Sequence, residues 1–72
     1  MDNTEQTILT AARKVFINKG LDGARMQEIA DEAGINKAML HYYFRSKLKL
    51  FEEVLRITIV DFVPKIGTIL NS

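Results

Sequence analysis

The chain has 72 residues, which is enough for one small domain whose single hydrophobic core is only marginally stable. Apolar residues make up 47% of it, a fraction that argues against disorder, and the absence of cysteine excludes disulfides and thiolate metal sites. The net charge of +1 does not by itself indicate a polyanionic partner, so only a local concentration of charge could indicate one.

The sequence shows neither a signal-peptide pattern nor a segment suited to span a membrane. Residues 1–7 are polar and acidic, unlike the basic and then apolar start of a signal peptide. The most apolar window, residues 54–63, contains Arg56 and Asp61 and is too short to span a bilayer. We therefore expect no membrane partner, and a cytoplasmic location fits.

The first predicted helix covers residues 4–19, where apolar side chains recur at helical spacing. Asn3 or Thr4 is suited to cap its start, and Gly20 is suited to end it, so residues 21–24 are expected to form a loop. The apolar residues that keep this helical spacing, and are expected on the buried face, are Ile8, Ala12, Val15, Phe16 and Ile17.

Two further helices follow, at about residues 26–33 and 37–44. The first places Met26, Ile29, Ala30 and Ala33 on one buried face. Gly34 supplies a turn conformation that other residues adopt at a cost, and Asn36 is a good cap for the next helix. Two short helices joined by such a turn predict a helix-turn-helix, whose second helix enters the major groove of DNA.

The helix at 37–44 is predicted to have two faces. Leu40 and Phe44 point inward with Tyr43 beside them, because residues three and four apart share a face. The outer face then carries Lys37, Ala38, His41 and Tyr42. Met39 is expected to pack inward or at the helix edge.

Charge is concentrated on the same stretch. No acidic residue lies between Glu32 and Glu52, whereas Lys37, Arg45, Lys47 and Lys49 do. Such a run is most often a solvated face, but its coincidence with the motif favours contact with phosphates.

Ser46 is expected to cap a fourth helix that begins at Lys47. Lys47 and Lys49 lie in its first turn, where the helix dipole favours acids by about 0.3–1 kcal/mol each. Either they face an external anion such as a DNA phosphate, or they are a surface pair of negligible cost. Both interpretations remain open from the sequence.

Residues 54–63 of this helix are apolar on nearly all sides, which three short helices cannot cover. We expect the segment to meet a partner chain or a further domain. Pro64 is expected to kink or end the helix, and residues 65–72 to form a connector or the start of another helix. The expected division is a DNA-binding domain at 1–50, and a linking helix with the start of a ligand-binding and dimerisation domain at 51–72.

The outer face suits a groove-reading helix. Asn36, Lys37 and His41 offer hydrogen-bonding groups, and small Ala38 permits close approach. Tyr42 and Tyr43 could donate their hydroxyls to phosphates, with the Tyr43 ring partly in the core. A lone histidine without cysteine or an orienting partner marks no metal site and no catalytic site, so no cofactor and no enzyme activity are expected.

The motif and its flanks together form one pattern: Ile29-Ala30, Ala33-Gly34-Ile35, Lys37, Leu40, Tyr42-Tyr43-Phe44, Ser46-Lys47 and Leu50-Phe51, preceded by Ala11-Ala12, Phe16 and Lys19-Gly20. This pattern resembles the N-terminal DNA-binding domain of TetR-type regulators over about residues 5–55. The resemblance implies an all-α fold, a three-helix bundle with a homeodomain-like helix-turn-helix and a fourth helix linking it to a C-terminal domain.

It also implies a homodimer that binds a palindromic double-stranded DNA operator at the nucleoid, represses transcription and is released by a small-molecule effector. The effector would bind a larger C-terminal helical domain outside these residues. Carried over by position, the expected DNA contacts are Arg25, Asn36, Lys37, Ala38, His41, Tyr42, Tyr43 and Lys47.

Some positions depart from the family pattern. Arg25 stands where a threonine usually caps the second helix, so the cap is lost but the guanidinium could keep a phosphate contact. Ala38 replaces a common glycine, Met39 a small residue and His41 a common tyrosine, which would alter base preference. Lys49 stands where acids are frequent.

The alternative is a small helical interaction module that docks another protein through the apolar fourth helix. The two hypotheses differ in their response to salt, because DNA binding weakens steeply as salt is added and apolar docking does not.

Overall fold

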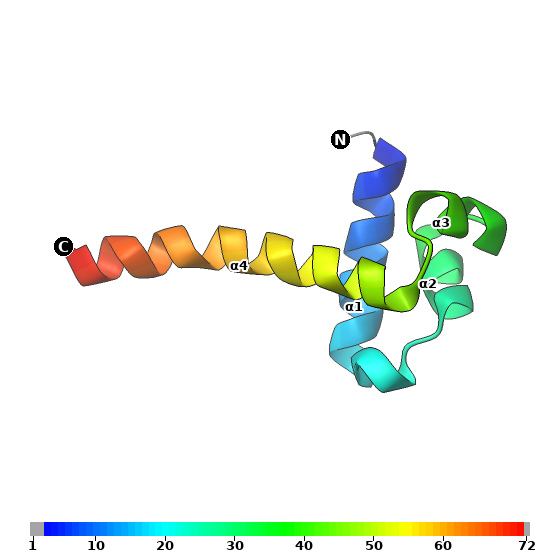
Figure 1. Cartoon of the computed structure of the whole chain (residues 1–72), viewed down its shortest axis with the longest axis horizontal. Helices are drawn as coiled ribbons and strands as arrows, with labels where there is room; N and C mark the ends of the chain where they lie inside the picture. Colours follow the sequence, from blue (N-terminus) through cyan, green and yellow to red (C-terminus); the bar gives the residue numbers. More distant parts are fainter. Residues whose placement is uncertain (1–2, 72) are drawn as a thin grey trace.

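A computed structural model describes the backbone of residues 3–71 and the side chains of residues 3–61. The helices follow in the order α1 (Asn3–Gly23), α2 (Met26–Ala33), α3 (Lys37–Tyr43) and α4 (Lys47–Asn71), with no strand among these residues. Figure 1 shows α1, α2 and α3 gathered into a bundle, while α4 crosses α1 and extends away from it. The all-α prediction is therefore confirmed.

One apolar cluster holds the bundle together. It joins the inner face of α1 to α2, to a single residue of α3 and to the first turns of α4. Its buried members are Ile8, Leu9, Ala12, Val15, Phe16, Ala24, Ile29, Ala30, Leu40, Leu50 and Val54. Because burial of apolar area is the main favourable term in folding, this cluster fixes how α2 and α3 sit on α1.

The predicted turn and caps of the motif are confirmed. Gly34 has φ 74° and ψ 28°, the left-handed conformation that closes α2, and its N–H bonds to the carbonyl of Asp31 at 3.2 Å. The carboxamide oxygen of Asn36 accepts the Met39 N–H at 2.7 Å, and the Ser46 hydroxyl accepts the Lys49 N–H at 3.1 Å. These bonds satisfy backbone donors that a helix start otherwise leaves unpaired.

The end of α1 differs from the prediction. Gly20 does break the helix, with φ 72° and ψ 174°, but residues 21–23 form a further helical turn rather than a loop. The Ala24 N–H bonds to the Gly20 carbonyl at 3.1 Å, which closes this turn. Ile17 was expected on the apolar face and is 72% exposed, because three successive apolar residues cannot all share one side of a helix.

Pro64 was expected to kink or end the fourth helix, and of these two alternatives the end is wrong, since α4 runs from Lys47 to Asn71. A proline removes one backbone hydrogen bond, which the remaining bonds of a 25-residue helix outweigh. Residues 65–71 accordingly continue α4, and Ser72 lies outside the described residues.

The expected uncovered apolar surface of α4 is present up to residue 61. Val54 is buried, but Leu55, Ile59 and Val60 are 47%, 50% and 55% exposed. The side chains of residues 62 and 63 of this segment lie outside the described residues. Among the described residues, no helix combines the length and the apolar character needed to cross a bilayer.

Candidate nucleic-acid interface

The two predicted faces of α3 are separated in the structure. Leu40 is fully buried, and Tyr43 and Phe44 are half-buried against the same core. Phe44 lies at the C-cap, one residue beyond the helix. The exposed side chains of this element are Lys37, Ala38, Met39, His41 and Tyr42. Burial of one face against α1 and α2 therefore holds the other face outward.

Met39 lies with the exposed residues rather than in the core. Its side chain is 44% exposed, so the interpretation in which it packs inward is wrong and a position at the helix edge remains. Met39 is the residue before Leu40, so it projects about 100° around the helix from the buried side.

Tyr42 is the most exposed of the aromatic residues in this part of the chain, at 83%. Its ring lies edge to face against the half-buried ring of Tyr43, with centroids 5.4 Å apart and planes at 86°. The favourable edge-to-face contact orients the exposed ring without burying it. The exposed Tyr42 ring is thus held beside the half-buried Tyr43 ring.

The His41 ring is oriented by the backbone of Arg45, two residues after the end of α3. Its Nδ1 atom lies 3.4 Å from the carbonyl oxygen of Arg45. Since a carbonyl only accepts, this contact requires a proton on Nδ1. In the neutral ring the outward Nε2 atom is then a hydrogen-bond acceptor.

Arg25 occupies the N-cap of α2 but does not cap it with its side chain. Its backbone is extended, with φ −120° and ψ 142°, and the side chain makes no capping hydrogen bond. The Glu28 carboxylate instead accepts the Arg25 N–H, which is one half of a capping box. The guanidinium is left exposed at the start of α2, as expected from the sequence.

Lys47 is the predicted contact that faces its own chain. Its Nζ atom lies 3.0 Å from the carbonyl oxygen of Ala24 and 3.5 Å from that of Asp22. The side chain is half-buried between the start of α4 and the end of α1. Nothing in the local sequence pattern indicated this pairing, because the partners are 23 and 25 residues away.

Two acids of α2, Glu28 and Glu32, form ion pairs with lysines of α1. Glu32 forms an ion pair with Lys14 at 3.4 Å, and Glu28 forms one with Lys19. The hydrogen bond from Lys19 and its positive charge hold the pKa of Glu28 below the usual 4.5. The negative charges of Glu28 and Glu32 are therefore compensated by α1, whereas Asp31 accepts a hydrogen bond from Gln27 within α2.

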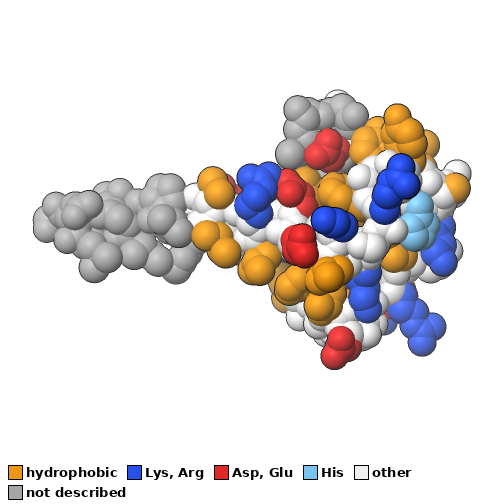
Figure 2. All heavy atoms as spheres, in the orientation of Figure 1, with side chains coloured by type: hydrophobic (Ala, Val, Ile, Leu, Met, Phe, Trp, Pro, Cys, Tyr) orange, Lys and Arg blue, Asp and Glu red, His pale blue; other side chains and the backbone are white. Residues whose placement is uncertain are grey.

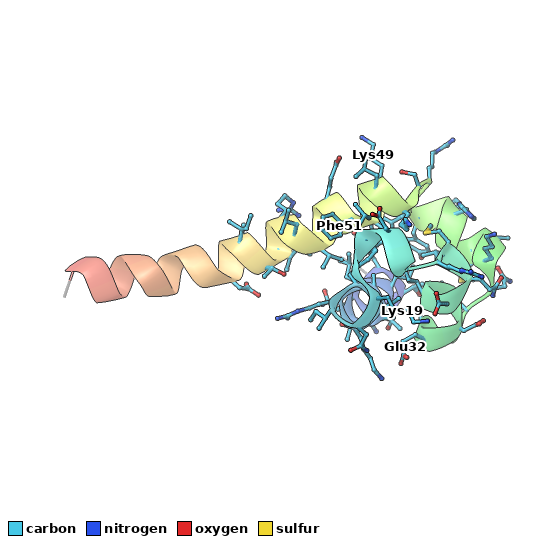
Figure 3. The ribbon with its side chains drawn as sticks, turned by 90° about the horizontal axis from the view of Figure 1, so that it is seen from below. Lys19, Glu32, Lys49 and Phe51 are labelled. Carbon is cyan, nitrogen blue, oxygen red and sulfur yellow. The ribbon has the colours of Figure 1, made fainter. Side chains whose placement is uncertain are left out.

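Cations remain on the side of α3 and of the start of α4. Lys37, Arg45 and Lys49 are exposed, and Figure 2 shows Lys and Arg side chains spread over the end of the molecule that carries α3. Lys49 extends away from the bundle in Figure 3. Arg45 and Lys49 also line an open cleft of about 390 Å³ with Tyr43, Phe44 and Glu53, whose carboxylate is paired with Arg56. These two cations were in the predicted basic stretch but not among the expected contacts.

Comparison with known proteins gives a consistent result. The profile of the family described as "Bacterial regulatory proteins, tetR family" matches residues 8–54. The chain is 37% identical to the transcriptional activator FasR of Mycolicibacterium smegmatis over 99% of this chain and 32% of that protein. It is 48% identical to the transcriptional repressor NicS of Pseudomonas putida over 75% of this chain and 26% of that one.

Solved structures with the same fold are also similar to this chain in sequence. A TetR-family regulator from Mesorhizobium loti superposes with a TM-score of 0.79 at 34% identity, over 97% of this chain and 38% of that one. A mutant of HlyIIR gives a TM-score of 0.72 at 47% identity, over 74% of this chain and 29% of that one. The chain thus spans about a third or less of the length of FasR and NicS. Its profile, relatives and fold together place the chain in the TetR family of bacterial regulatory proteins, as the N-terminal helix-turn-helix part.

Proposed function

We propose that the described residues form the sequence-reading part of a DNA-binding transcriptional regulator, with α3 inserted in the major groove of its operator. The observation that carries this proposal is the exposure of Lys37, His41 and Tyr42 on α3, the helix whose Leu40 is fully buried in the core. A helix with its side chains is about 10–12 Å across, and the major groove is about 12 Å wide.

The proposed contacts are of two kinds, those to base edges and those to phosphates. Asn36, Lys37, Ala38 and His41 lie at the start and middle of the outer face, where they would meet base edges. The carboxamide oxygen of Asn36 is engaged as the cap, so its amide nitrogen is the group left for a base or phosphate. Contacts to base edges specify the DNA sequence, whereas contacts to phosphates only fix the position of the protein on the duplex.

Phosphate contacts are proposed for the residues that flank this face. Arg25 at the start of α2 and the hydroxyls of Tyr42 and Tyr43 are the groups expected from the sequence. Arg45 and Lys49 are added because both are exposed beside the C-terminal end of α3. A guanidinium matches phosphate geometry well, which suits Arg25 and Arg45 to this role.

The regulator is further proposed to act as a homodimer on a palindromic operator. A single seven-residue α3 reaches few base pairs, and helix-turn-helix dimers reach two half-sites about one helical turn apart. In this proposal residues 1–50 read DNA, and α4 from residue 51 leads to a C-terminal domain that dimerises and binds a small effector. Effector binding would release the operator and end repression, in the cytoplasm at the nucleoid.

A second candidate function is protein docking through α4. Leu55, Ile59 and Val60 are each about half exposed, an arrangement that favours an apolar partner. In a longer regulator the same residues would meet the C-terminal domain, so this observation is compatible with both functions.

Selection of random duplexes by the full-length protein, followed by affinity measurement at several salt concentrations, tests the proposal. We expect enrichment of an inverted repeat and a steep fall of affinity with salt, with about 0.9 units of log–log slope for each phosphate contact. If no duplex is enriched, or affinity for DNA does not change with salt, the proposal is wrong. Salt-independent binding to a protein partner would support the docking function.

A further inference from the structure

We propose that Lys47 is a positioning residue, which holds the connector between α1 and α2 (Ala24 and Arg25) against the first turn of α4 and thereby places Arg25 for contact with DNA. This inference rests on the proposed function, and it replaces the expected phosphate contact of Lys47. It follows from the contacts of the Lys47 ammonium, from the charges at the helix ends and from the bonds that lead onward to α2.

The Lys47 ammonium is engaged within the chain. It donates to the Ala24 carbonyl at 3.0 Å and lies 3.5 Å from the Asp22 carbonyl, in the last turn of α1. The ammonium has three N–H groups, so these two acceptors take up most of its capacity. The side chain is half-buried, whereas Lys49 in the same helical turn is exposed and points away from the bundle (Figure 3).

The electrostatics of the two helix ends explain this placement. The first turn of α4 carries partial positive charge and disfavours a lysine. The last turn of α1 carries partial negative charge and presents carbonyls without helical partners. Lys47 belongs by sequence to the first turn of α4, but its ammonium bonds to the Ala24 carbonyl directly after α1 and lies near the Asp22 carbonyl in the last turn of α1, where a cation is favourable. The acceptors that the ammonium meets are therefore backbone carbonyls of the chain itself.

From Ala24 a short series of bonds reaches the start of α2. Ala24 is buried, and its N–H bonds to the Gly20 carbonyl at 3.1 Å. The next residue is Arg25, whose N–H bonds to the Glu28 carboxylate and whose carbonyl accepts the Ile29 N–H at 3.1 Å. Loss of the Lys47 bond would leave the Ala24 carbonyl unpaired beside the core and would free the residue that precedes Arg25.

A double-mutant cycle on the full-length protein tests the link to Arg25. Lys47→Met keeps the apolar stem and removes the donors, and Arg25→Ala removes the proposed phosphate contact. We expect Lys47→Met to weaken operator binding by about tenfold in the wild-type background and by less than about threefold in the Arg25→Ala background. The salt slope of the double variant should equal that of Arg25→Ala.

A direct phosphate contact by Lys47 predicts the opposite. Lys47→Met would then weaken binding by the same factor in both backgrounds, and the double variant would lose about two units of slope instead of one. That result, or an Arg25→Ala variant that binds as tightly as the wild type, overturns the positioning role. Lys49→Met is the matched control and should cost the same factor in both backgrounds. Lys47→Gln serves the same cycle if Lys47→Met fails to fold.

Hydrogen exchange without DNA tests the contact separately from the proposed function. We expect the amides of residues 21–25 to exchange about tenfold faster or more in Lys47→Met, and to be unchanged in Lys49→Met. Unchanged exchange in Lys47→Met overturns the inference even if the protein binds its operator. If exchange responds but the wild type binds no duplex, the proposed function fails, and with it the role of Lys47 in positioning a DNA contact.

Discussion

The ring of Phe16 in α1 meets the ring of Phe51 in α4 edge to face, with centroids 5.1 Å apart and planes at 90°. Phe16 is buried and Phe51 is half-buried. Two residues before Phe51, Lys49 leaves the same helix in the outward direction (Figure 3). The aromatic contact therefore fixes how α4 crosses α1, and with it where the first turn of α4 lies relative to α3.

Replacing either phenylalanine by leucine should show that this contact is specific. We expect Phe16→Leu and Phe51→Leu each to lower the free energy of unfolding, and their effects to be non-additive by about 0.5–1.5 kcal/mol. Urea unfolding of the two single variants and the double variant measures this coupling. Ile17→Ala is the control, because Ile17 is 72% exposed and its loss should change stability by no more than about 0.5 kcal/mol. Strictly additive effects would contradict a specific aromatic contact.

Most of the fold could be predicted because its signals are local. Asn36, Ser46 and Gly34 are caps and turns whose chemistry depends on residues within a few positions, and all three behave as expected. The helical turn after Gly20 was missed because the glycine signal says only that a helix is interrupted. Whether the chain then continues as loop or turn depends on contacts with α4.

The two glycines with positive φ should respond differently to the same substitution. Gly34, at φ 74° and ψ 28°, is in the left-handed region that asparagine tolerates, whereas Gly20, at φ 72° and ψ 174°, is in a region almost restricted to glycine. An added Cβ meets nothing within 4 Å at either position, so the cost is conformational. We expect Gly34→Asn to destabilise by less than about 1 kcal/mol and Gly20→Asn by about 1–3 kcal/mol, measured by urea unfolding. Equal costs would contradict this account.

The cap of α3 should separate stability from DNA affinity. Asn36→Ala removes the acceptor for the Met39 N–H and should lower the free energy of unfolding by about 0.5–2 kcal/mol. Asn36→Asp keeps the acceptor, so stability should remain near that of the wild type. Because the aspartate adds a negative charge at the groove-reading end, operator affinity should still fall. Thermal unfolding and duplex binding of the two variants measure these effects, and an Asn36→Asp variant as unstable as Asn36→Ala would show that the cap is unimportant.

The candidate site was less predictable than the fold. Periodicity separates Leu40 from Ala38 and Tyr42, because residues two positions apart lie on opposite sides of a helix. Periodicity does not show which group a long side chain contacts when that group is distant in sequence, as Ala24 is from Lys47. The Lys47 contact arises only when α4 is placed against the end of α1 by the core. A family resemblance carries residue positions over, but the partner of each side chain has to be read from the structure.

The ion pair between Lys19 and Glu28 should make stability fall at low pH. The hydrogen bond and charge of Lys19, assisted by the Arg25 N–H, lower the pKa of Glu28 below 4.5 in the folded chain. The unfolded chain then binds the proton first, so this contribution is complete above about pH 4.5 and is lost as pH falls through the folded pKa. Glu28→Gln should therefore be less stable than the wild type at pH 7, with the difference shrinking at pH 3. Urea unfolding at both values measures this, and the exposed Glu52→Gln variant should show no such trend.

Base preference should depend on His41 in a defined direction. The Arg45 carbonyl requires a proton on Nδ1, so Nε2 of the neutral ring accepts, and the amino groups of adenine and cytosine are the donors in the major groove. We expect the selected operator to carry adenine or cytosine at the contacted position of each half-site. His41→Ala should relax the preference there by about 1–3 kcal/mol and leave other positions unchanged. Selection of random duplexes by wild type and variant measures this, with Asn18→Ala, at an exposed position of α1, as the control. A preference for guanine at that position, or an unchanged preference in His41→Ala, would exclude direct reading by Nε2.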